Sequence, residues 1–275
     1  MKHSEGTFES GGVALYCQSW LPEAEPRAAV VIVHGLGEHS GRYGNLVDAL
    51  LPRGYALHSF DLRGHGRSPG PRGHIDAWAD FRNDLRAFVQ RVAAEEAGRP
   101  LFLFGHSMGG LIVLEYVLHH PEGLRGVIAS APGLSTEGLS PMMVRMARIL
   151  SRLAPRLSLS SGLDATGISR DPAVVQAYQN DPLVHDRGTP RAAVEGGTAI
   201  AWTLAHAADL RLPLLIVHGT EDRLVPCAAS RVFFEQVSSP DKTRLEYEGG
   251  YHELHNDLNR ERVLNDIAAW LAERS

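Results

Sequence analysis

A serine framed by glycines is the residue in this sequence best suited to covalent chemistry. Gly105-His106-Ser107-Met108-Gly109 fits the pattern G-x-S-x-G, directly after an apolar stretch and directly before a helical pattern. In that setting the serine lies on a strained turn, with φ expected to be positive, and its hydroxyl projects above the sheet as a nucleophile. A Cβ at position 105 or 109 would collide with neighbouring backbone, so glycine is needed there. The alternative is a glycine-rich turn that merely buries a serine.

A serine nucleophile needs a base and an acid that orients it, and two later segments supply candidates. In proteins with this turn the chain order is Ser, then Asp or Glu, then His. Glu221 and Asp222 follow the apolar stretch 214–217, where a strand would end. His252 is the candidate base, and His255 is either a neighbour of the substrate or an ordinary surface histidine. Together these residue types predict acyl transfer through a serine.

Two N–H donors near the serine are needed to stabilise the negatively charged intermediate. The segment His34-Gly35-Leu36-Gly37 follows the first long apolar stretch, so its backbone is placed to face the nucleophile. We expect the amide nitrogens of Leu36 and Met108 to form this oxyanion hole. The glycines match neither a dinucleotide-binding nor a P-loop motif.

The segment 252–255, His-Glu-Leu-His, falls one residue short of the zinc motif H-E-x-x-H. Its histidines are therefore three positions apart, and the sequence offers no third ligand nearby. Cys17 and Cys227 have no metal-ligand spacing. We expect neither a metal nor a cofactor.

Six motifs along the chain carry a resemblance to a known family. They are HGLGEHSGRY (34–43), DLRGHGRS (61–68), GHSMGG (105–110), YQNDPL (178–183), GTEDRLVP (219–226) and YHELH (251–255). With them the chain resembles, over nearly its whole length, an α/β-hydrolase of the monoacylglycerol lipase type. GHSMGG and the aspartate loop are common to many α/β-hydrolases, whereas HGxGEHSGRY together with YxxDPL is more particular. The resemblance implies that Ser107, Asp222 and His252 form a catalytic triad.

The resemblance also implies a polar pocket for the glycerol part of a monoacylglycerol. Its candidate residues are Glu38, Arg42, His106, Tyr178 and His255. From the residues alone, Glu38 and Arg42 are four apart at a loop-to-helix junction and equally suit a structural ion pair. The implied activity is cleavage of a monoacylglycerol ester to glycerol and fatty acid. A lysophospholipase, a broad carboxylesterase and a non-catalytic binding protein of the same fold remain alternatives.

Short apolar strands alternating with helices must hold these residues in place. The predicted strands are Ala28–Val33, Ala56–Phe60, Leu101–Phe104, Gly126–Ser130, Leu214–Val217 and Thr243–Tyr247, with Gly12–Trp20 as an earlier antiparallel strand at the sheet edge. The predicted helices are Tyr43–Leu51, Trp78–Glu96, Gly109–His119, Ala228–Val237 and Asp257–Ala272. This alternation predicts a mostly parallel, doubly wound sheet covered on both faces, and the resemblance implies that this sheet belongs to an α/β-hydrolase fold.

One connection is too long for a simple strand–helix–strand unit. About 80 residues separate the strands that end at Ser130 and begin at Leu214, where about 30 would suffice. Residues 132–212 therefore read as a helical cap, with helical pieces near Pro141–Leu153, Pro172–Tyr178 and Pro190–His206. Residues 1–131 and 213–275 form the hydrolase core.

The first cap helix is amphipathic and basic. Its apolar residues are Met142, Met143, Met146, Ile149, Leu150 and Leu153, and its basic residues are Arg145, Arg148, Arg152 and Arg156. Such a helix suits either contact with an anionic membrane surface or a lid packed on the body of the protein.

Composition excludes several classes of protein. The 275 residues carry 27 basic and 32 acidic side chains, a net charge of −5, which argues against a nucleic-acid binder. The polar N-terminal residues lack the apolar core of a signal peptide, and no apolar run is long enough to span a membrane. We expect a cytoplasmic protein with peripheral membrane contact at most. The oligomeric state is not predicted.

Overall fold

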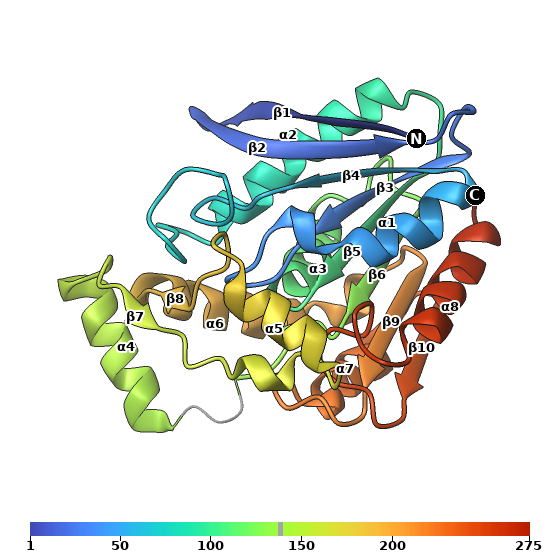
Figure 1. The fold of residues 1–275 in the computed structure, drawn as a ribbon. Helices are drawn as coiled ribbons and strands as arrows, with labels where there is room; N and C mark the ends of the chain where they lie inside the picture. Colours follow the sequence, from blue (N-terminus) through green and yellow to red (C-terminus); the bar gives the residue numbers. More distant parts are fainter. Residues whose placement is uncertain (137–139) are drawn as a thin grey trace.

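The structure is a computed structural model that describes residues 1–136 and 140–275 (Figure 1). Its centre is an eight-stranded sheet in the order β1-β2-β4-β3-β5-β6-β9-β10. The strands are β1 (Lys2–Ser10), β2 (Val13–Leu21), β3 (Ala28–Val33), β4 (Tyr55–Phe60), β5 (Leu101–His106), β6 (Gly126–Ser130), β9 (Leu214–Gly219) and β10 (Lys242–Tyr247). In this order, the neighbouring strands from β4 through β3, β5, β6 and β9 to β10 are all parallel. β2 is antiparallel to both of its neighbours, β1 and β4.

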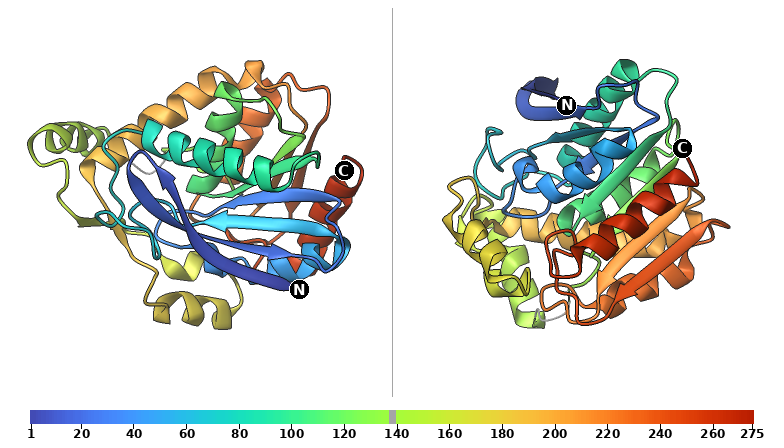
Figure 2. Two further views of the ribbon diagram at one scale, coloured as in Figure 1. Left: turned by 90° about the horizontal axis from the view of Figure 1, so that it is seen from above. Right: turned by 45° about the vertical axis from the view of Figure 1, so that its right-hand side comes forward.

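The parallel strands are apolar because helices cover both faces of the sheet (Figure 2). Every residue of β3, β4, β5, β6 and β9 is buried. One face packs on α1 (Gly44–Leu50) and α8 (Arg260–Ala272). The other face packs on α2 (Ala79–Glu95), α3 (Met108–His119) and α7 (Cys227–Gln236). Short 3₁₀ helices lie at Ser40–Arg42, Leu51–Arg53, Ala165–Gly167 and Ala207–Asp209.

The segment between β6 and β9 contains α4 (Pro141–Leu153), α5 (Pro172–Asn180) and α6 (Pro190–Ala205). Two short strands, β7 (Leu159–Ser160) and β8 (Arg187–Gly188), pair with each other. Each of the three helices begins with a proline after a capping residue, namely Ser140, Asp171 and Thr189. The side chains of these three capping residues accept hydrogen bonds from amides in the first turn of each helix. The capping residue and the proline together therefore determine where each helix begins.

This segment lies against loops that follow the carboxyl ends of the strands. The His185 amide donates to the Gly37 carbonyl at 2.8 Å, in the loop after β3. The Gly73 backbone approaches the Arg187 carbonyl so closely that an added Cβ would lie 2.1 Å from its oxygen. The predicted helical insertion 132–212, of which 137–139 fall outside the described residues, therefore sits over the edge of the sheet where the candidate site lies.

The predicted fold class is confirmed, and one strand assignment was wrong. The strand predicted as Gly12–Trp20 is antiparallel, as expected, but it does not form the edge of the sheet. That edge is β1, which pairs with β2 along its length. β1 was missed because most of its residues are polar and exposed. The glycine pair Gly11-Gly12, both with positive φ, joins the two strands and is a hairpin signal in the sequence.

Candidate active site

Ser107 occupies the tight turn between β5 and α3. Its backbone has φ 54° and ψ −119°, a strained conformation for a residue with a Cβ. A Cβ added to Gly105 would lie 2.3 Å from the carbonyl oxygen of Gly109. A Cβ added to Gly109 would lie 2.1 Å from the carbonyl oxygen of Val33. The positive φ and the steric need for both glycines are confirmed. The turn leaves Ser107 half-buried at the N-terminal end of a helix.

The loop after β3 lies directly beside this serine. A Cβ added to Gly35 would lie 3.1 Å from the Ser107 Cβ. Leu36 follows in that loop, and Met108 opens α3 on the other side of the serine. The two expected oxyanion donors thus belong to the two segments that flank Ser107, and their role stays a prediction.

Asp222 and His252 form a buried pair at the ends of β9 and β10. The His252 Nδ1 lies 2.7 Å from the Asp222 Oδ2, and neither side chain is more than 4% exposed. The Asp222 Oδ1 accepts hydrogen bonds from the amides of Leu224 and Val225, at 2.8 and 2.9 Å. Glu221, the alternative acid, is exposed. The structure therefore brings Asp222, and not Glu221, to His252.

The two partners shift each other's pKa values in opposite directions. Burial works to raise the pKa of Asp222, but the His252 imidazole and hydrogen bonds from His218, His252 and the Val225 amide hold it well below its usual range. Burial works to lower the pKa of His252, and the Asp222 carboxylate outweighs it and raises that pKa. An ionised Asp222 beside a more basic His252 is the arrangement that general-base chemistry requires.

Glu38 and Arg42 form a buried ion pair. A third residue, Glu253, joins it, and the sequence analysis did not predict this contact. The Arg42 guanidinium contacts Glu38 at 2.9 Å and binds both carboxylate oxygens of Glu253, at 2.6 and 2.8 Å. Glu38 also accepts hydrogen bonds from the Gly35 amide at 2.6 Å and the Tyr43 hydroxyl at 2.8 Å. The ion pair expected from the spacing of Glu38 and Arg42 is present. The only signal for Glu253 in the sequence was its position next to the candidate base His252.

The other predicted pocket residues gather around this ion-pair cluster. The Arg42 guanidinium lies over the Tyr178 ring at 4.6 Å, which brings α5 to the site. His106 lies between His252 and His255, at ring-centre distances of 4.6 and 5.1 Å. His255 stacks on Tyr43 at 4.9 Å and is fully buried, so its reading as a surface histidine was wrong.

Three imidazole nitrogens beside His252 have no protein partner. Among the described residues, His106 Nδ1 and both ring nitrogens of His255 are buried without a hydrogen bond. Burial holds the pKa of both histidines below the ordinary value, and for His106 the neighbouring His252 and His255 lower it further. A neutral imidazole can both donate and accept hydrogen bonds, but these nitrogens are enclosed by protein in this structure.

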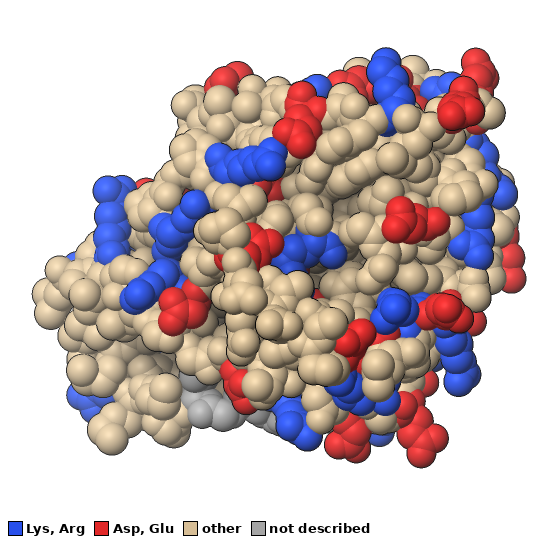
Figure 3. All heavy atoms as spheres, in the orientation of Figure 1, with Lys and Arg blue, Asp and Glu red and all other residues tan. Residues whose placement is uncertain are grey.

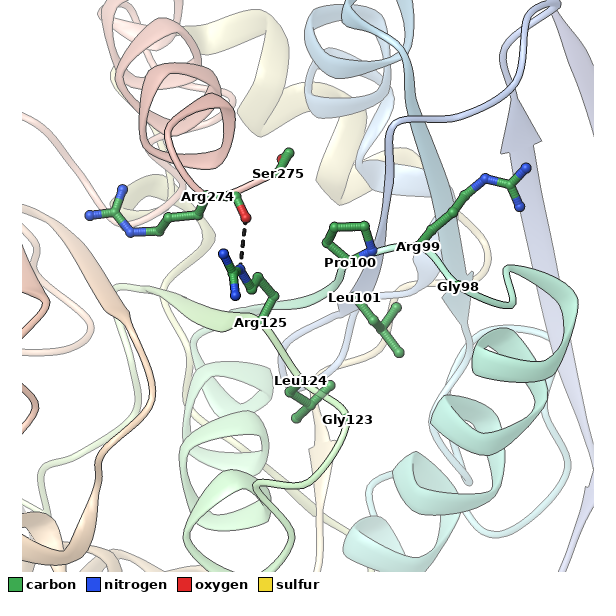
Figure 4. A pocket seen from close by; sticks show the side chains of 9 residues that line it. All are labelled: Gly98, Arg99, Pro100, Leu101, Gly123, Leu124, Arg125, Arg274 and Ser275. Atoms are coloured by element: carbon green, nitrogen blue, oxygen red, sulfur yellow. Dashed lines mark hydrogen bonds between the residues drawn. The ribbon is translucent and has the colours of Figure 1, made fainter.

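Ser107 does not line either of two hollows on the surface of the described residues. One, of about 290 Å³, lies at the amino ends of β5 and β6 and is lined in part by Arg99, Arg125 and Arg274 (Figure 4). These arginines already have partners, including a hydrogen bond from Arg125 to the Arg274 carbonyl. The other, of about 410 Å³, is lined by α5 residues and by Arg223 and Tyr251, the neighbours of Asp222 and His252 in the chain.

The described residues form neither a metal-binding cluster nor a membrane-spanning helix. Within residues 1–136 and 140–275, no group of three His, Cys, Asp or Glu side chains is arranged to hold a metal ion. No helix in the described part of the chain is long and apolar enough to cross a membrane.

The sheet order, the strained serine at the end of β5 and the buried Asp–His pair define the α/β-hydrolase class. The family model described as "Serine aminopeptidase, S33" matches residues 24–259. A monoacylglycerol lipase from Mycolicibacterium smegmatis is 38% identical over 271 residues, which are 98% of this chain and 96% of that protein. The chain therefore belongs to this family and, within it, to the α/β-hydrolases of the monoacylglycerol lipase type.

Two solved structures are similar over nearly the whole chain. The crystal structure of a monoacylglycerol lipase from Paleococcus ferrophilus has a TM-score of 0.88 and 38% identity, and the match covers 95% of this chain and 99% of that one. A soluble variant of monoglyceride lipase from Saccharomyces cerevisiae, in complex with a substrate analog, has a TM-score of 0.89 and 28% identity, covering 98% and 95%. The resemblance found in the sequence motifs is thus confirmed at the level of the family.

Proposed function

We propose that this chain is a serine hydrolase that cleaves monoacylglycerols to glycerol and a fatty acid. The observation that carries the proposal is the placement of a strained Ser107 and a buried Asp222–His252 pair on the fold of the monoacylglycerol lipase family. The substrate named for the relatives supports the choice of ester.

In the proposed reaction, Ser107 attacks the ester carbonyl while His252 accepts the hydroxyl proton. Asp222 fixes the tautomer of His252 and stabilises the imidazolium ion that forms. The amides of Leu36 and Met108 stabilise the oxyanion, and His252 then protonates the departing glycerol. Water hydrolyses the acyl-enzyme by the same route. The steps require no cofactor.

The polar residues around His252 fit the glycerol end of the substrate. Glu38 and Arg42 are engaged with each other and with Glu253, so they hold the wall of the pocket in place. His106, Tyr178 and His255 lie against that wall and add polar groups to this end of the site. A second acyl chain would leave such groups unpaired, at a cost of about 1–3 kcal/mol each. This supports selectivity for esters with a single acyl chain.

We further propose that residues 132–212 act as a cap whose first helix meets lipid. Met142, Met146 and Ile149 on α4 are 75%, 48% and 43% exposed, whereas Val144, Ala147 and Ser151 face the protein. Figure 3 shows a largely uncharged surface where Figure 1 places α4. Arg145, Arg148 and Arg152 are exposed beside the apolar strip, as contact with an anionic membrane requires.

The proposal places the enzyme in the cytoplasm, in reversible contact with membranes. The free thiols of Cys17 and Cys227 suit a reducing compartment.

A hydrolysis panel tests the function directly. Purified protein is given mono-, di- and triacylglycerols, lysophospholipids and a soluble p-nitrophenyl ester, and its serine is labelled with a phosphonate probe. We expect kcat/KM for monoacylglycerol to exceed that for diacylglycerol by roughly a hundredfold, with triacylglycerol near background. Preference for lysophospholipids would indicate a lysophospholipase, and comparable rates on mono- and triacylglycerol would indicate a general lipase. Absence of both labelling and turnover would indicate a non-catalytic binding protein.

A further inference from the structure

Asp222 is held by a second histidine that the proposed triad does not use. His218, near the end of β9, is fully buried, and its Nε2 lies 3.2 Å from the Asp222 Oδ2. That carboxylate oxygen is the same one that lies 2.7 Å from the His252 Nδ1. Two imidazoles therefore share one oxygen of the candidate catalytic acid.

The surroundings of His218 fix which ring nitrogen carries its proton. Its Nε2 also lies 3.1 Å from the Val225 carbonyl oxygen, which can only accept a hydrogen bond. Both neighbours of Nε2 are thus acceptors, so Nε2 must carry hydrogen. On the other side, Nδ1 lies 2.8 Å from the Ser230 hydroxyl, which can donate to it. A neutral His218 with hydrogen on Nε2 satisfies every contact.

An arginine behind Ser230 supports this assignment. The Arg244 guanidinium lies 3.4 Å from the Ser230 Oγ and donates to the Cys227 carbonyl at 3.0 Å. The Ser230 hydroxyl also lies 3.0 Å from that carbonyl, but because Arg244 already donates to the carbonyl, the single hydrogen of Ser230 can go to His218 instead.

We infer that His218 is a positioning residue for the catalytic acid. Its Nε2–H holds the Asp222 carboxylate in the orientation that meets His252, and it takes up part of the negative charge on Oδ2. Two backbone amides hold the other oxygen, so the carboxylate cannot rotate without losing a donor. This inference rests on the proposed function, because it assigns Asp222 the role of the acid.

Loss of the His218 donor should have an effect on catalysis that loss of a purely structural residue would not have. Removing one donor leaves more negative charge on Oδ2 to stabilise a protonated His252. The acidic limb of kcat/KM against pH should then move to higher pH, because the base stays protonated longer. The titratable and charged groups facing His252 or His218 are Asp222, His106, His255, Glu253, Glu38, Arg244 and Cys227. All of these groups are unchanged in the His218 variants described below.

The test compares His218→Leu with His218→Gln on a soluble p-nitrophenyl ester. His218→Leu should lower kcat about tenfold, as for the loss of one hydrogen bond to a charged group, while KM changes little. Its acidic limb should shift to higher pH. His218→Gln, whose amide N–H can replace Nε2–H, should restore kcat and the position of the limb.

His58 on β4 offers a matched control. It is a buried strand histidine with a serine hydroxyl 2.9 Å from Nδ1 and a carboxylate, that of Glu96, 3.3 Å from Nε2. His58→Leu should lower the free energy of unfolding without moving the pH profile. If folded His218→Leu behaves in the same way, or if its limb stays in place or falls, the inference is overturned.

Nuclear magnetic resonance of the wild-type protein removes the dependence on a folded variant. With ¹⁵N-labelled histidine, His218 should show hydrogen on Nε2 and none on Nδ1 near neutral pH. Hydrogen on Nδ1 would overturn the inference. A wild-type protein that neither labels with phosphonate nor turns over would instead refute the proposed function, whatever the tautomer of His218.

Discussion

Arg42 and Glu253 lie 211 positions apart in the chain and form a bidentate ion pair, with N–O distances of 2.6 and 2.8 Å. Arg42 follows β3, near the loop that lies against Ser107. Glu253 follows β10 and is adjacent to His252. The pair therefore ties the segment beside the nucleophile to the segment that carries the base. Both side chains are nearly inaccessible to water, so the contact is protected from screening by salt.

Loss of this ion pair should destabilise the fold. Glu253→Ala leaves Arg42 with Glu38 as its single carboxylate partner, and we expect a loss of about 3 kcal/mol in the free energy of unfolding. Glu253→Gln should lose less, because its amide oxygen still accepts a hydrogen bond. Urea unfolding measures both. The exposed pair Arg91–Glu95 is the control, and Glu95→Gln should change stability by less than about 1 kcal/mol. Equal effects at positions 95 and 253 would contradict this account.

Substitution of the proposed triad residues should lower activity by several powers of ten. Ser107→Ala should abolish covalent labelling and lower turnover by several powers of ten. Asp222→Asn should lower kcat by about 10⁴-fold, because His252 then takes the wrong tautomer. Glu221→Gln should behave as wild type, since Glu221 is exposed. An inactive Glu221→Gln with a normal Asp222→Asn would show that the acid has been misassigned.

Activity should rise with pH as His252 loses its proton. Burial works to lower the pKa of His252, but Asp222 raises it above the ordinary histidine value of about 6.5. Because the neutral imidazole is the base, kcat/KM falls as the pH drops through the raised pKa. The midpoint of the acidic limb should therefore lie above about 6.5, measured with a soluble ester whose own charge is constant. A midpoint clearly below that value would mean that Asp222 does not act on His252 as described.

The exposed face of α4 should matter for lipid substrates alone. Replacing Met142, Met146 and Ile149 by Ser should weaken activity on long-chain monoacylglycerol dispersions more than on a short soluble ester, because apolar area contributes about 25 cal/mol per Å² on contact with lipid. Stability should hardly change, since these side chains are already exposed. Val232→Ser, at an equally exposed site on α7, serves as the control. Equal losses on both substrates would point to damage of the fold instead.

Local patterns in the sequence were sufficient to predict most elements. The predicted strands Ala28–Val33 and Gly126–Ser130 have the same bounds in the structure, because continuous apolar runs mark strands buried on both faces. The helix Pro141–Leu153 was also predicted with the observed bounds, since Ser140 and Pro141 mark its start. The polar strand β1 was missed because it buries little and so carries no apolar pattern.

By itself, the sequence determined the serine turn, the order of the candidate catalytic residues and the family. The reason is that the residues that make one turn or one loop are adjacent in the chain, so its steric requirements can be recognised in the sequence, as in Gly105 to Gly109. Only the tertiary structure showed the contacts themselves. Asp222, which the resemblance implies as the acid, lies beside His252, Glu253 binds Arg42, and His218 lies beside Asp222. The Asp222–His252 and Arg42–Glu253 contacts join segments that are 30 and 211 positions apart, and a single sequence holds no local signal for which side chains meet there. His218 and Asp222 are four positions apart, and their contact depends on the turn that follows β9.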